Sequence, residues 1–199
     1  PEDSYSNEQK QLSGDRVGIS KKPEIKAWSG PFIMATANTR VVRRSEALLA
    51  LRQESYGSNF TYQEHAYHKS WLSAVSSLLL TGLSVLVLLS PLKRLVKPFL
   101  PKPGEGPSEA VQENGWFDCK FIAESEDGTK SVFNMHGKGD PGYKVTSKLV
   151  SECALCLIED IEELPGGRGY GGVLTSASGL GHSLISRLTK VGIDFKGPL

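Results

Sequence analysis

Hydrophobic residues along the chain switch between strand-like and helical spacing. Residues 30–39, GPFIMATANT, alternate as in a half-buried strand. The next segment, residues 39–52, places five residues on one helical face: Val41, Val42, Ser45, Leu48 and Leu49. This pattern predicts a strand followed by an amphipathic helix.

The most apolar segment runs from Leu72 to Leu89 and holds no charged side chain. Its length is close to the roughly 20 residues with which a helix crosses the hydrocarbon core of a bilayer. Trp71 suits one membrane interface, and basic residues follow the segment on the other side. We predict a membrane helix held by Trp71, Leu79, Leu86, Lys93, Arg94 and Lys97. The alternative is a buried core helix.

Alternation returns after a Pro/Gly-rich linker. Residues 116–137 predict a β-hairpin with Asp127 and Gly128 at its turn. Asp140 and Pro141 then predict the start of a helix. We expect that helix to bury six residues: Leu149, Val150, Cys153, Leu157, Ile161 and Leu164. The later segment VGIDF supplies one more strand.

These patterns predict an α+β fold. It consists of a small antiparallel or mixed sheet with packed helices, interrupted by one hydrophobic membrane helix. The expected regions are a polar extended arm (1–27), the first part of the α+β domain (28–70), a membrane-associating helix with its basic flank (71–100), a Pro/Gly linker (101–115) and the second part of the α+β domain (116–199).

Composition narrows the function. The chain has 199 residues, enough to bury a core. Its net charge of +1 and pI near 8.1 argue against a dedicated nucleic-acid binder, which concentrates basic residues on one face. The first 24 residues are polar and cannot build a core, so they read as an arm that becomes ordered on contact with a partner. No secretory signal peptide is visible.

Cysteine and histidine residues suggest neither a metal site nor a catalytic site. The C-x-x-C pair Cys153 and Cys156 lies inside a strongly helical run, and a zinc site needs two more ligands. We therefore expect buried apolar cysteines. No histidine has a partner that is visible in the sequence: His65, His68, His136 and His182. No catalytic residue and no metal ligand is predicted.

Residues 171–188, GGVLTSASGLGHSLISRL, have the layout of a dinucleotide-binding loop, with a short apolar run, a glycine turn and a helix. The turn has only Gly179 and Gly181, without the third glycine, and Asp194 follows sooner than the about 20 residues usual for a ribose-binding acid. We predict a structural turn and no cofactor-binding residue. NAD(P) is expected only if a Rossmann domain lies upstream.

Two longer stretches carry a family resemblance. GKGDPGYKVTSKLVSECALCL followed by GGVLTSASGLGHSLISRLTKVGIDF resembles the C-terminal signature of the saccharopine dehydrogenase-like oxidoreductases. GPFIMATANTRVVRRSEALL resembles their middle portion, so the resemblance covers nearly all of residues 28–196. It implies the second, α+β domain of that family with its apolar membrane-associating stretch, without the N-terminal Rossmann domain that binds NAD(P). If the family sheet is retained, residues 30–39 pair with the strand that begins at Trp116.

The resemblance and the apolar segment together predict a non-catalytic accessory subunit. It would be anchored in an organelle membrane, thylakoid or mitochondrial, as a scaffold within a photosynthetic or respiratory complex. Its expected partners are membrane lipids and other protein subunits, and no nucleic acid. The basic cluster Arg40, Arg43 and Arg44 is the expected contact with a partner or a lipid headgroup, or else a solvated helix face.

Two alternatives stay open. In one, the chain is the C-terminal fragment of a membrane-associated NAD(P)-dependent reductase whose Rossmann domain is missing here. In the other, it lies peripherally on a lipid surface.

Overall fold

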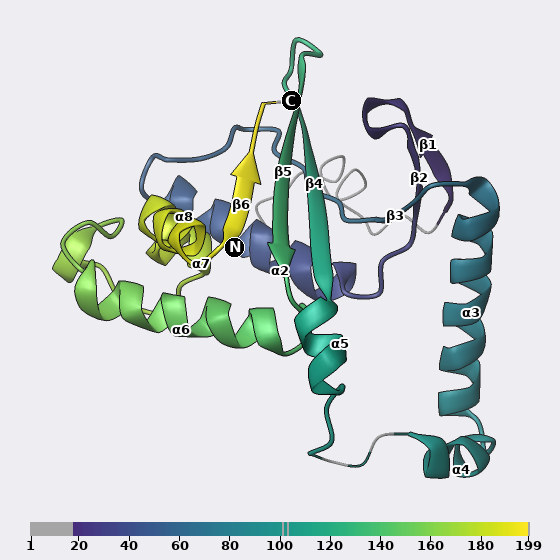
Figure 1. Ribbon diagram of the computed structural model, residues 1–199. Helices are drawn as coiled ribbons and strands as arrows, with labels where there is room; N and C mark the ends of the chain where they lie inside the picture. The colour runs from purple at the N-terminus through teal and green to yellow at the C-terminus, as the bar shows by residue number, and fades with distance from the viewer. Residues whose placement is uncertain (1–17, 101, 103, 199) are drawn as a thin grey trace. The chain divides into compact units, whose positions relative to one another are not determined.

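The computed structural model describes residues 18–198 of the chain, except 101 and 103. These residues form two three-stranded antiparallel sheets and seven α-helices (Figure 1), which confirms the predicted α+β class. They divide into two compact units. Unit 1 comprises the described residues up to Arg43 together with 57–105, and unit 2 comprises 44–56 and 106–199.

The sheet of unit 1 has the order β1-β2-β3, with all neighbours antiparallel. Its strands are β1 (Ser20–Lys22), β2 (Ala27–Gly30) and β3 (Ala66–His68). A 3-10 turn, η2 (Pro23–Ile25), joins the first two strands and ends at Lys26, whose φ of 51° is left-handed. This tight turn reverses the chain so that β1 and β2 can pair.

Helix α3 (Trp71–Leu89) follows the same sheet. Its N-terminus is capped by Ser70, whose side chain accepts a hydrogen bond from the Ser73 N–H. The helix contacts β2 and β3, and Ala74 is its one buried residue. Two short basic helices come next, α4 (Lys93–Val96) and η3 (Lys97–Phe99). The predicted apolar helix is therefore present, and most of its surface is exposed.

The strand predicted over residues 30–39 is wrong. β2 ends at Gly30, and helix α2 (Ala35–Ala50) already begins five residues later. Pro31 has no N–H to donate to a sheet, which favours the end of the strand there. In the first turn of α2 the Thr39 hydroxyl donates to the Ala35 carbonyl at 2.6 Å. The Thr36 hydroxyl donates to the Ile33 carbonyl, and the Asn38 amide donates to Glu64. The alternating polar residues thus belong to a helix, where threonine hydroxyls bond back to the preceding turn.

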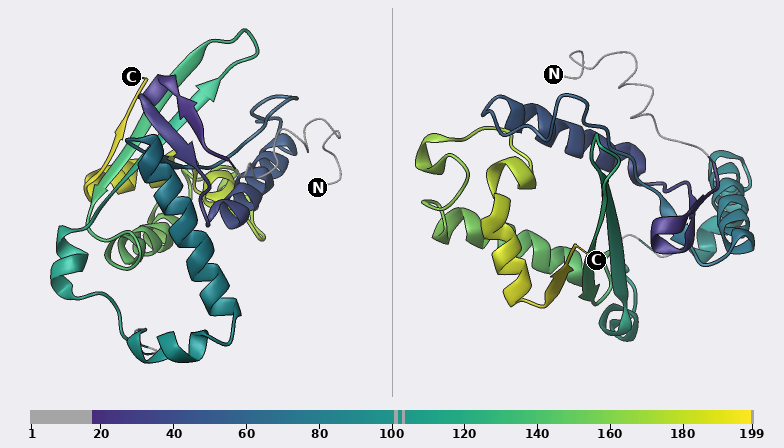
Figure 2. Two further views of the ribbon diagram at one scale, coloured as in Figure 1. Left: turned by 90° about the vertical axis from the view of Figure 1, so that its right-hand side faces the viewer. Right: turned by 90° about the horizontal axis from the view of Figure 1, so that it is seen from above.

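The sheet of unit 2 has the order β4-β5-β6. Its strands are β4 (Trp116–Glu124), β5 (Lys130–Lys138) and β6 (Ile193–Lys196), and helix α5 (Glu109–Asn114) precedes them. The predicted hairpin is confirmed, and its turn end extends beyond α6 and α8 (Figures 1 and 2). At the turn, Asp127 accepts from the Ser125 hydroxyl and from the Thr129 N–H, which lowers the pKa of its carboxyl group. The expected pairing of residues 30–39 with β4 is wrong, because most of residues 30–39 lie in or before helix α2 and β4 pairs with β5.

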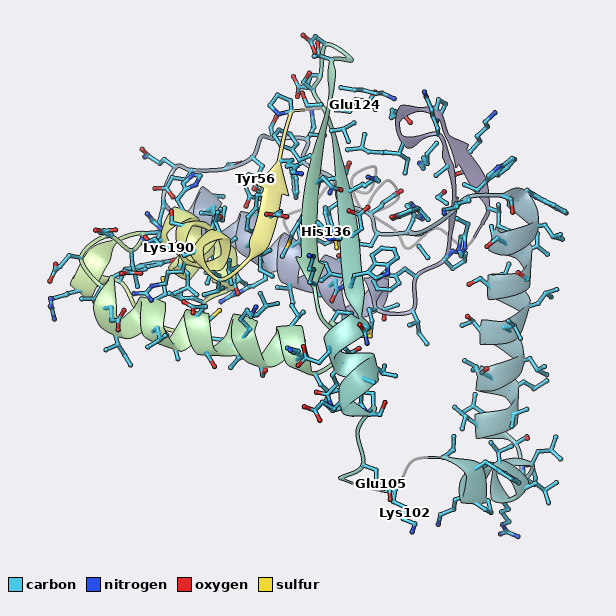
Figure 3. All side chains as sticks on the ribbon, in the orientation of Figure 1. Tyr56, Lys102, Glu105, Glu124, His136 and Lys190 are labelled. Carbon is cyan, nitrogen blue, oxygen red and sulfur yellow. The ribbon has the colours of Figure 1, made fainter. Side chains whose placement is uncertain are left out.

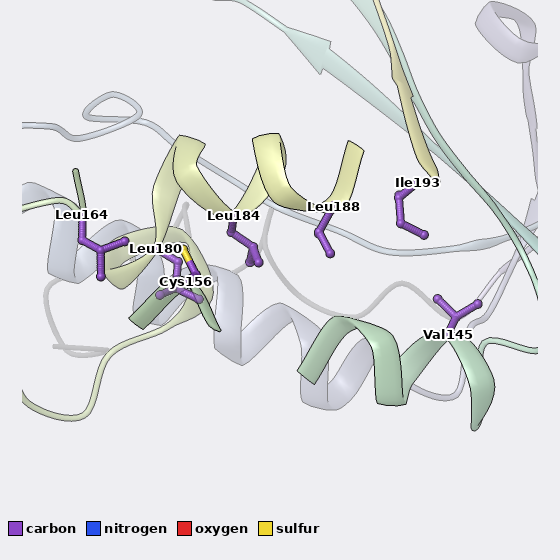
Figure 4. Packing of buried hydrophobic residues seen from close by; sticks show 7 residues of the cluster. All are labelled: Val145, Cys156, Leu164, Leu180, Leu184, Leu188 and Ile193. Carbon is purple, nitrogen blue, oxygen red and sulfur yellow. The ribbon is translucent and has the colours of Figure 1, made fainter. Parts of the chain in front are cut away.

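Helices α6 (Lys144–Glu159) and α8 (Gly181–Lys190) pack together and against β6 to form the core of unit 2. Two short helices, η4 (Gly167–Gly169) and α7 (Ser176–Gly179), connect them. Figure 4 shows the buried cluster: Val145, Cys156, Leu164, Leu180, Leu184, Leu188 and Ile193.

The face of α6 that is buried differs in part from the predicted one. Val150 and Leu157 are 64% and 54% exposed, whereas Val145 and Cys156 are buried. Leu149 and Cys153 pack against the core as predicted. Apolar residues occupy two adjacent faces of this helix, so their spacing alone does not identify the face that meets α8.

Candidate functional site on the polar face of the second sheet

The sheet of unit 2 has one polar and one apolar face. In the hairpin, Asp118 lies opposite His136 and Lys120 opposite Asn134. Strand β6 extends this face by placing Asp194 beside His136. The residues that alternate with these along each strand form the other face, where Phe117, Met135 and Ile193 pack against the core. Strict alternation along three strands therefore gathers the titratable side chains on one surface.

Asp118 is the centre of this polar face. Its Oδ1 accepts a hydrogen bond from Asn134 Nδ2 at 2.8 Å, and its Oδ2 lies 3.3 Å from Lys120 Nζ. His136 Nδ1 lies 3.8 Å from Oδ1 of the same carboxylate. The Asp118 side chain is 15% exposed, and that of His136 is 37% exposed. The carboxylate of Asp118 is thus held in place and faces one nitrogen of the His136 ring. The ring itself is partly exposed and accessible to a ligand.

The indole of Trp116 completes the surroundings of His136, which Figure 3 labels on the sheet. The two ring centroids are 6.4 Å apart with an interplanar angle of 29°. Histidine changes its charge near neutral pH and is the side chain that most often transfers protons in enzymes. An imidazole beside a carboxylate and a flat apolar ring is suited to exchange a proton with a bound organic molecule.

The expectation that no histidine has a partner is wrong for His136. The hairpin pairs Glu124 with Lys130 across a five-residue loop, and this register places residues 118 and 136 opposite each other. A two-residue turn at Asp127 and Gly128 would instead place residue 118 opposite residue 137, and a shift of one residue moves a side chain to the other face. The turn residues alone therefore do not identify the pair.

The predicted anchor and contact residues lie on the surface. In α3, Trp71 is 54% exposed, Leu79 66% and Leu86 65%. Lys93, Arg94 and Lys97 are exposed as well. On α2, Arg40 and Arg44 are exposed and Arg43 is half-buried. Their contacts with lipid or protein stay predictions.

The cysteine pair on α6 is not poised for reactivity. Burial and a hydrogen bond to Asp160 raise the pKa of Cys156 to about 11, and burial also raises the pKa of Cys153. A raised pKa disfavours the thiolate that reacts or binds metal. Within the part of the chain that the structure describes, no three His, Cys, Asp or Glu residues are grouped to hold a metal ion.

The glycine turn before α8 is partly held by hydrogen bonds within itself. Thr175 and Ser178 form a capping box in which each side chain accepts from the backbone N–H of the other. At Gly181, where φ is 52°, a Cβ would lie 2.9 Å from the ring of Pro165. The N–H groups of Thr175, Ser178, Gly179 and Leu180 are bonded within the turn. Gly181 permits close packing. That the chain itself holds no NAD(P) stays a prediction.

Comparison with known proteins found relatives among mycobacterial enzymes. A protein of Mycobacterium tuberculosis with the provisional name trans-acting enoyl reductase is 38% identical over 191 residues, which cover 91% of this chain and 44% of that protein. The trans-acting enoyl reductase of Mycobacterium leprae is 33% identical over 88% of this chain and 43% of its own length, and that of Mycobacterium ulcerans is 31% identical over 89% and 43%. The chain therefore spans less than half the length of these relatives. No family model and no solved structure matches it.

These relatives correct four predictions. The assignment to the saccharopine dehydrogenase-like oxidoreductases is wrong, because the matching proteins are named enoyl reductases and no family model matches. A non-catalytic accessory subunit of a membrane complex is wrong for the same reason, since the relatives carry the name of an enzyme. The predicted scaffold role is wrong as well, because it was part of the subunit prediction. The thylakoid or mitochondrial location is also wrong, because the relatives are bacterial proteins.

Proposed function

We propose that this chain is part of an enoyl reductase. The observation that carries the proposal is the 38% identity that extends over 91% of the chain, so it includes both units and the polar sheet face. The name of the relatives supports a reduction of a carbon–carbon double bond conjugated to a carbonyl group. The word trans-acting in that name supports action on a substrate that another protein carries.

Such a reduction adds a hydride to the β-carbon of the enoyl group and a proton to the α-carbon. Four N–H groups of the glycine turn before α8 already bond within the turn. We therefore assign the hydride donor to no described residue of this chain. The proton is different, because the chain has a candidate donor for it. We assign that role to His136.

The geometry around His136 supports this role. Asp118, held by Asn134 and Lys120, lies 3.8 Å from Nδ1 of the imidazole. The partly exposed ring can then donate its proton to a carbanion that develops at the α-carbon. The indole of Trp116 offers a flat apolar surface for the adjoining acyl chain.

The test uses the full-length protein that carries this chain, an enoyl thioester of coenzyme A or of an acyl carrier protein, and NADH or NADPH. We expect oxidation of the nicotinamide and formation of the saturated thioester. His136→Gln should lower kcat by about 10²-fold or more, the scale of general acid catalysis, with less effect on KM. His182→Gln, on the surface of α8, is the matched control and should leave kcat unchanged.

The outcomes separate the two parts of the proposal. No reduction with any thioester and either nicotinamide would contradict the enoyl reductase assignment. Reduction at an unchanged rate by a folded His136→Gln protein would contradict the role of His136 and leave the assignment intact.

We also propose that α3 and its basic flank contact a lipid bilayer. The helix is long and apolar enough to cross one, by length and composition only, and 6% of its most apolar window is buried. Between Lys69 and Gly104 the chain has five basic and no acidic residues, so its charge complements anionic headgroups. Exposed apolar surface beside positive charge is the combination that lipid surfaces attract.

Flotation with lipid vesicles tests this contact. We expect the chain to float with anionic vesicles and less with neutral ones. Leu79→Asp with Leu86→Asp should abolish flotation. Val173→Asp, at a position that is 87% exposed outside this segment, is the control and should float like the original chain. Equal flotation of the α3 variant would contradict lipid contact by α3.

A further inference from the structure

Strand β4 forms an edge of its sheet, and this edge is long and regular. Its nine residues pair one-to-one with β5 from Trp116 to Glu124, without a bulge. It contains no proline, and within the described chain no strand pairs with its other side. Proteins usually protect edge strands with prolines, bulges, short length or charged side chains, lysine above all. β4 lacks the first three features. Its Asp118 and Lys120 have opposite charges, so they oppose pairing only in registers that bring like charges together.

The hairpin bonds define which backbone groups of β4 point outward. Hydrogen bonds from the Ser125 N–H to the Thr129 carbonyl and from the Gly139 N–H to the Gly115 carbonyl flank the hairpin ladder. Because antiparallel residues alternate, the odd-numbered residues of β4 point their N–H and C=O groups to β5. The even-numbered residues, from Trp116 to Glu124, point theirs to the open side.

We propose that a second copy of this chain pairs with β4 antiparallel, in the register that places Cys119 opposite Cys119 of the second copy. In this register Asp118 lies opposite Lys120 of the second copy, and the twofold symmetry repeats that ion pair. On the same face, Trp116 lies opposite Ile122 of the second copy. On the other sheet face, Phe117 lies opposite Phe121 of the second copy. Every facing pair from 116 to 122 is therefore complementary in charge or apolar character.

The neighbouring registers lack this complementarity. A shift of the twofold axis by one residue places either Lys120 opposite Lys120 or Asp118 opposite Asp118. Like charges directly opposite each other in a sheet are destabilising. The distribution of charge along β4 therefore selects one register among those that the outward backbone groups permit.

The pairing produces one continuous six-stranded sheet. Because the symmetry axis of such a pair is perpendicular to the sheet, the polar faces of both copies lie on the same side. The two His136 side chains then share one surface. This inference does not depend on the enoyl reductase assignment, since it rests on the edge and side chains of β4.

Charge reversal tests the register. In a mild detergent, which suppresses association through α3, light scattering should give the chain twice its mass of 21.6 kDa. Asp118→Lys alone and Lys120→Asp alone should each give the single mass, and the double variant should restore the dimer. A monomeric original chain, or a dimer insensitive to both single reversals, would overturn the proposal.

Cross-linking tests the same register in the unaltered chain. Cys119 is exposed and is in no disulfide. Opposite residues of this pair type have Cα atoms about 4.5 Å apart, within reach of a disulfide. Mild oxidation should therefore give a covalent dimer. Cys119→Ser combined with Ala123→Cys moves the thiol along the same face to a position about 27 Å from its counterpart, and should not cross-link. Equal cross-linking of both proteins would overturn the proposal.

Discussion

Helices α3 and α8 show opposite relations between apolar content and burial. Of the 19 residues of α3, only Ala74 is buried, and Leu79 and Leu86 are about two-thirds exposed. In the 10-residue α8, Leu184 and Leu188 are 9% and 6% exposed. The more apolar helix is thus the more exposed one.

The difference lies in how the apolar residues are arranged. In α8, leucines four residues apart form one stripe, and the other sides carry polar residues such as His182, Ser186 and Arg187. A single stripe can be buried completely against α6 and β6. In α3 the apolar residues surround the helix, so the sheet of unit 1 can cover only a small part of them. Regular spacing, rather than apolar content, predicts which helix the chain itself buries.

Truncating one leucine in each helix tests this comparison most strongly. Leu184→Ala should lower the free energy of unfolding by about 2–5 kcal/mol, because it leaves a cavity in the core. Leu79→Ala in α3 should change it by less than about 0.5 kcal/mol, as for other exposed positions. Urea unfolding followed by circular dichroism measures both. Equal losses would show that α3 is buried as deeply as α8.

A substitution that fills space tests how tightly the core of unit 2 is packed. At Gly137, on β5, a Cβ would lie 2.9 Å from Phe117 Cζ and 3.0 Å from Ile193 Cδ1. Gly137→Ala should therefore cost about 1–3 kcal/mol of stability, the usual cost of overpacking. Gly171→Ala is the control, because nothing lies within 4 Å of its Cβ position. If both variants unfold at the same urea concentration, the packing described here is wrong.

The ion cluster that joins α8 to α6 should make stability depend on pH. Arg187 contacts Glu152, Glu159 and Asp160, and its hydrogen bond lowers the pKa of the Asp160 carboxyl group. A carboxyl group with a lowered folded-state pKa stabilises the fold above its unfolded pKa, near 3.9, and that stability is lost as the pH falls through the folded-state pKa.

In Arg187→Met, the free energy of unfolding should therefore decrease less as the pH falls below about 4. Urea midpoints measured from pH 7 to pH 3 show the effect. Arg168→Met removes an exposed pair with Glu162 and serves as the control. An equally steep acid profile in Arg187→Met would contradict the role of the cluster.

Local patterns predicted the elements that depend on local physics. The hairpin followed from alternation and the Asp127-Gly128 turn, and α3 followed from its uncharged length. Residues 35–39 were misassigned because alternating Ala and Thr residues also suit the first turns of a helix. The buried face of α6 depends on α8, more than twenty residues further along the chain. The polar site was missed because its residues come together only through the register of the hairpin.

The most direct test of the central claim is the fate of an enoyl thioester in heavy water. The full-length protein that carries this chain is incubated with the thioester and a nicotinamide reductant, and the product is analysed by mass spectrometry. The account predicts a saturated thioester with one solvent deuterium at the α-carbon, formed much more slowly by His136→Gln. An enoyl thioester that remains unreduced would contradict it.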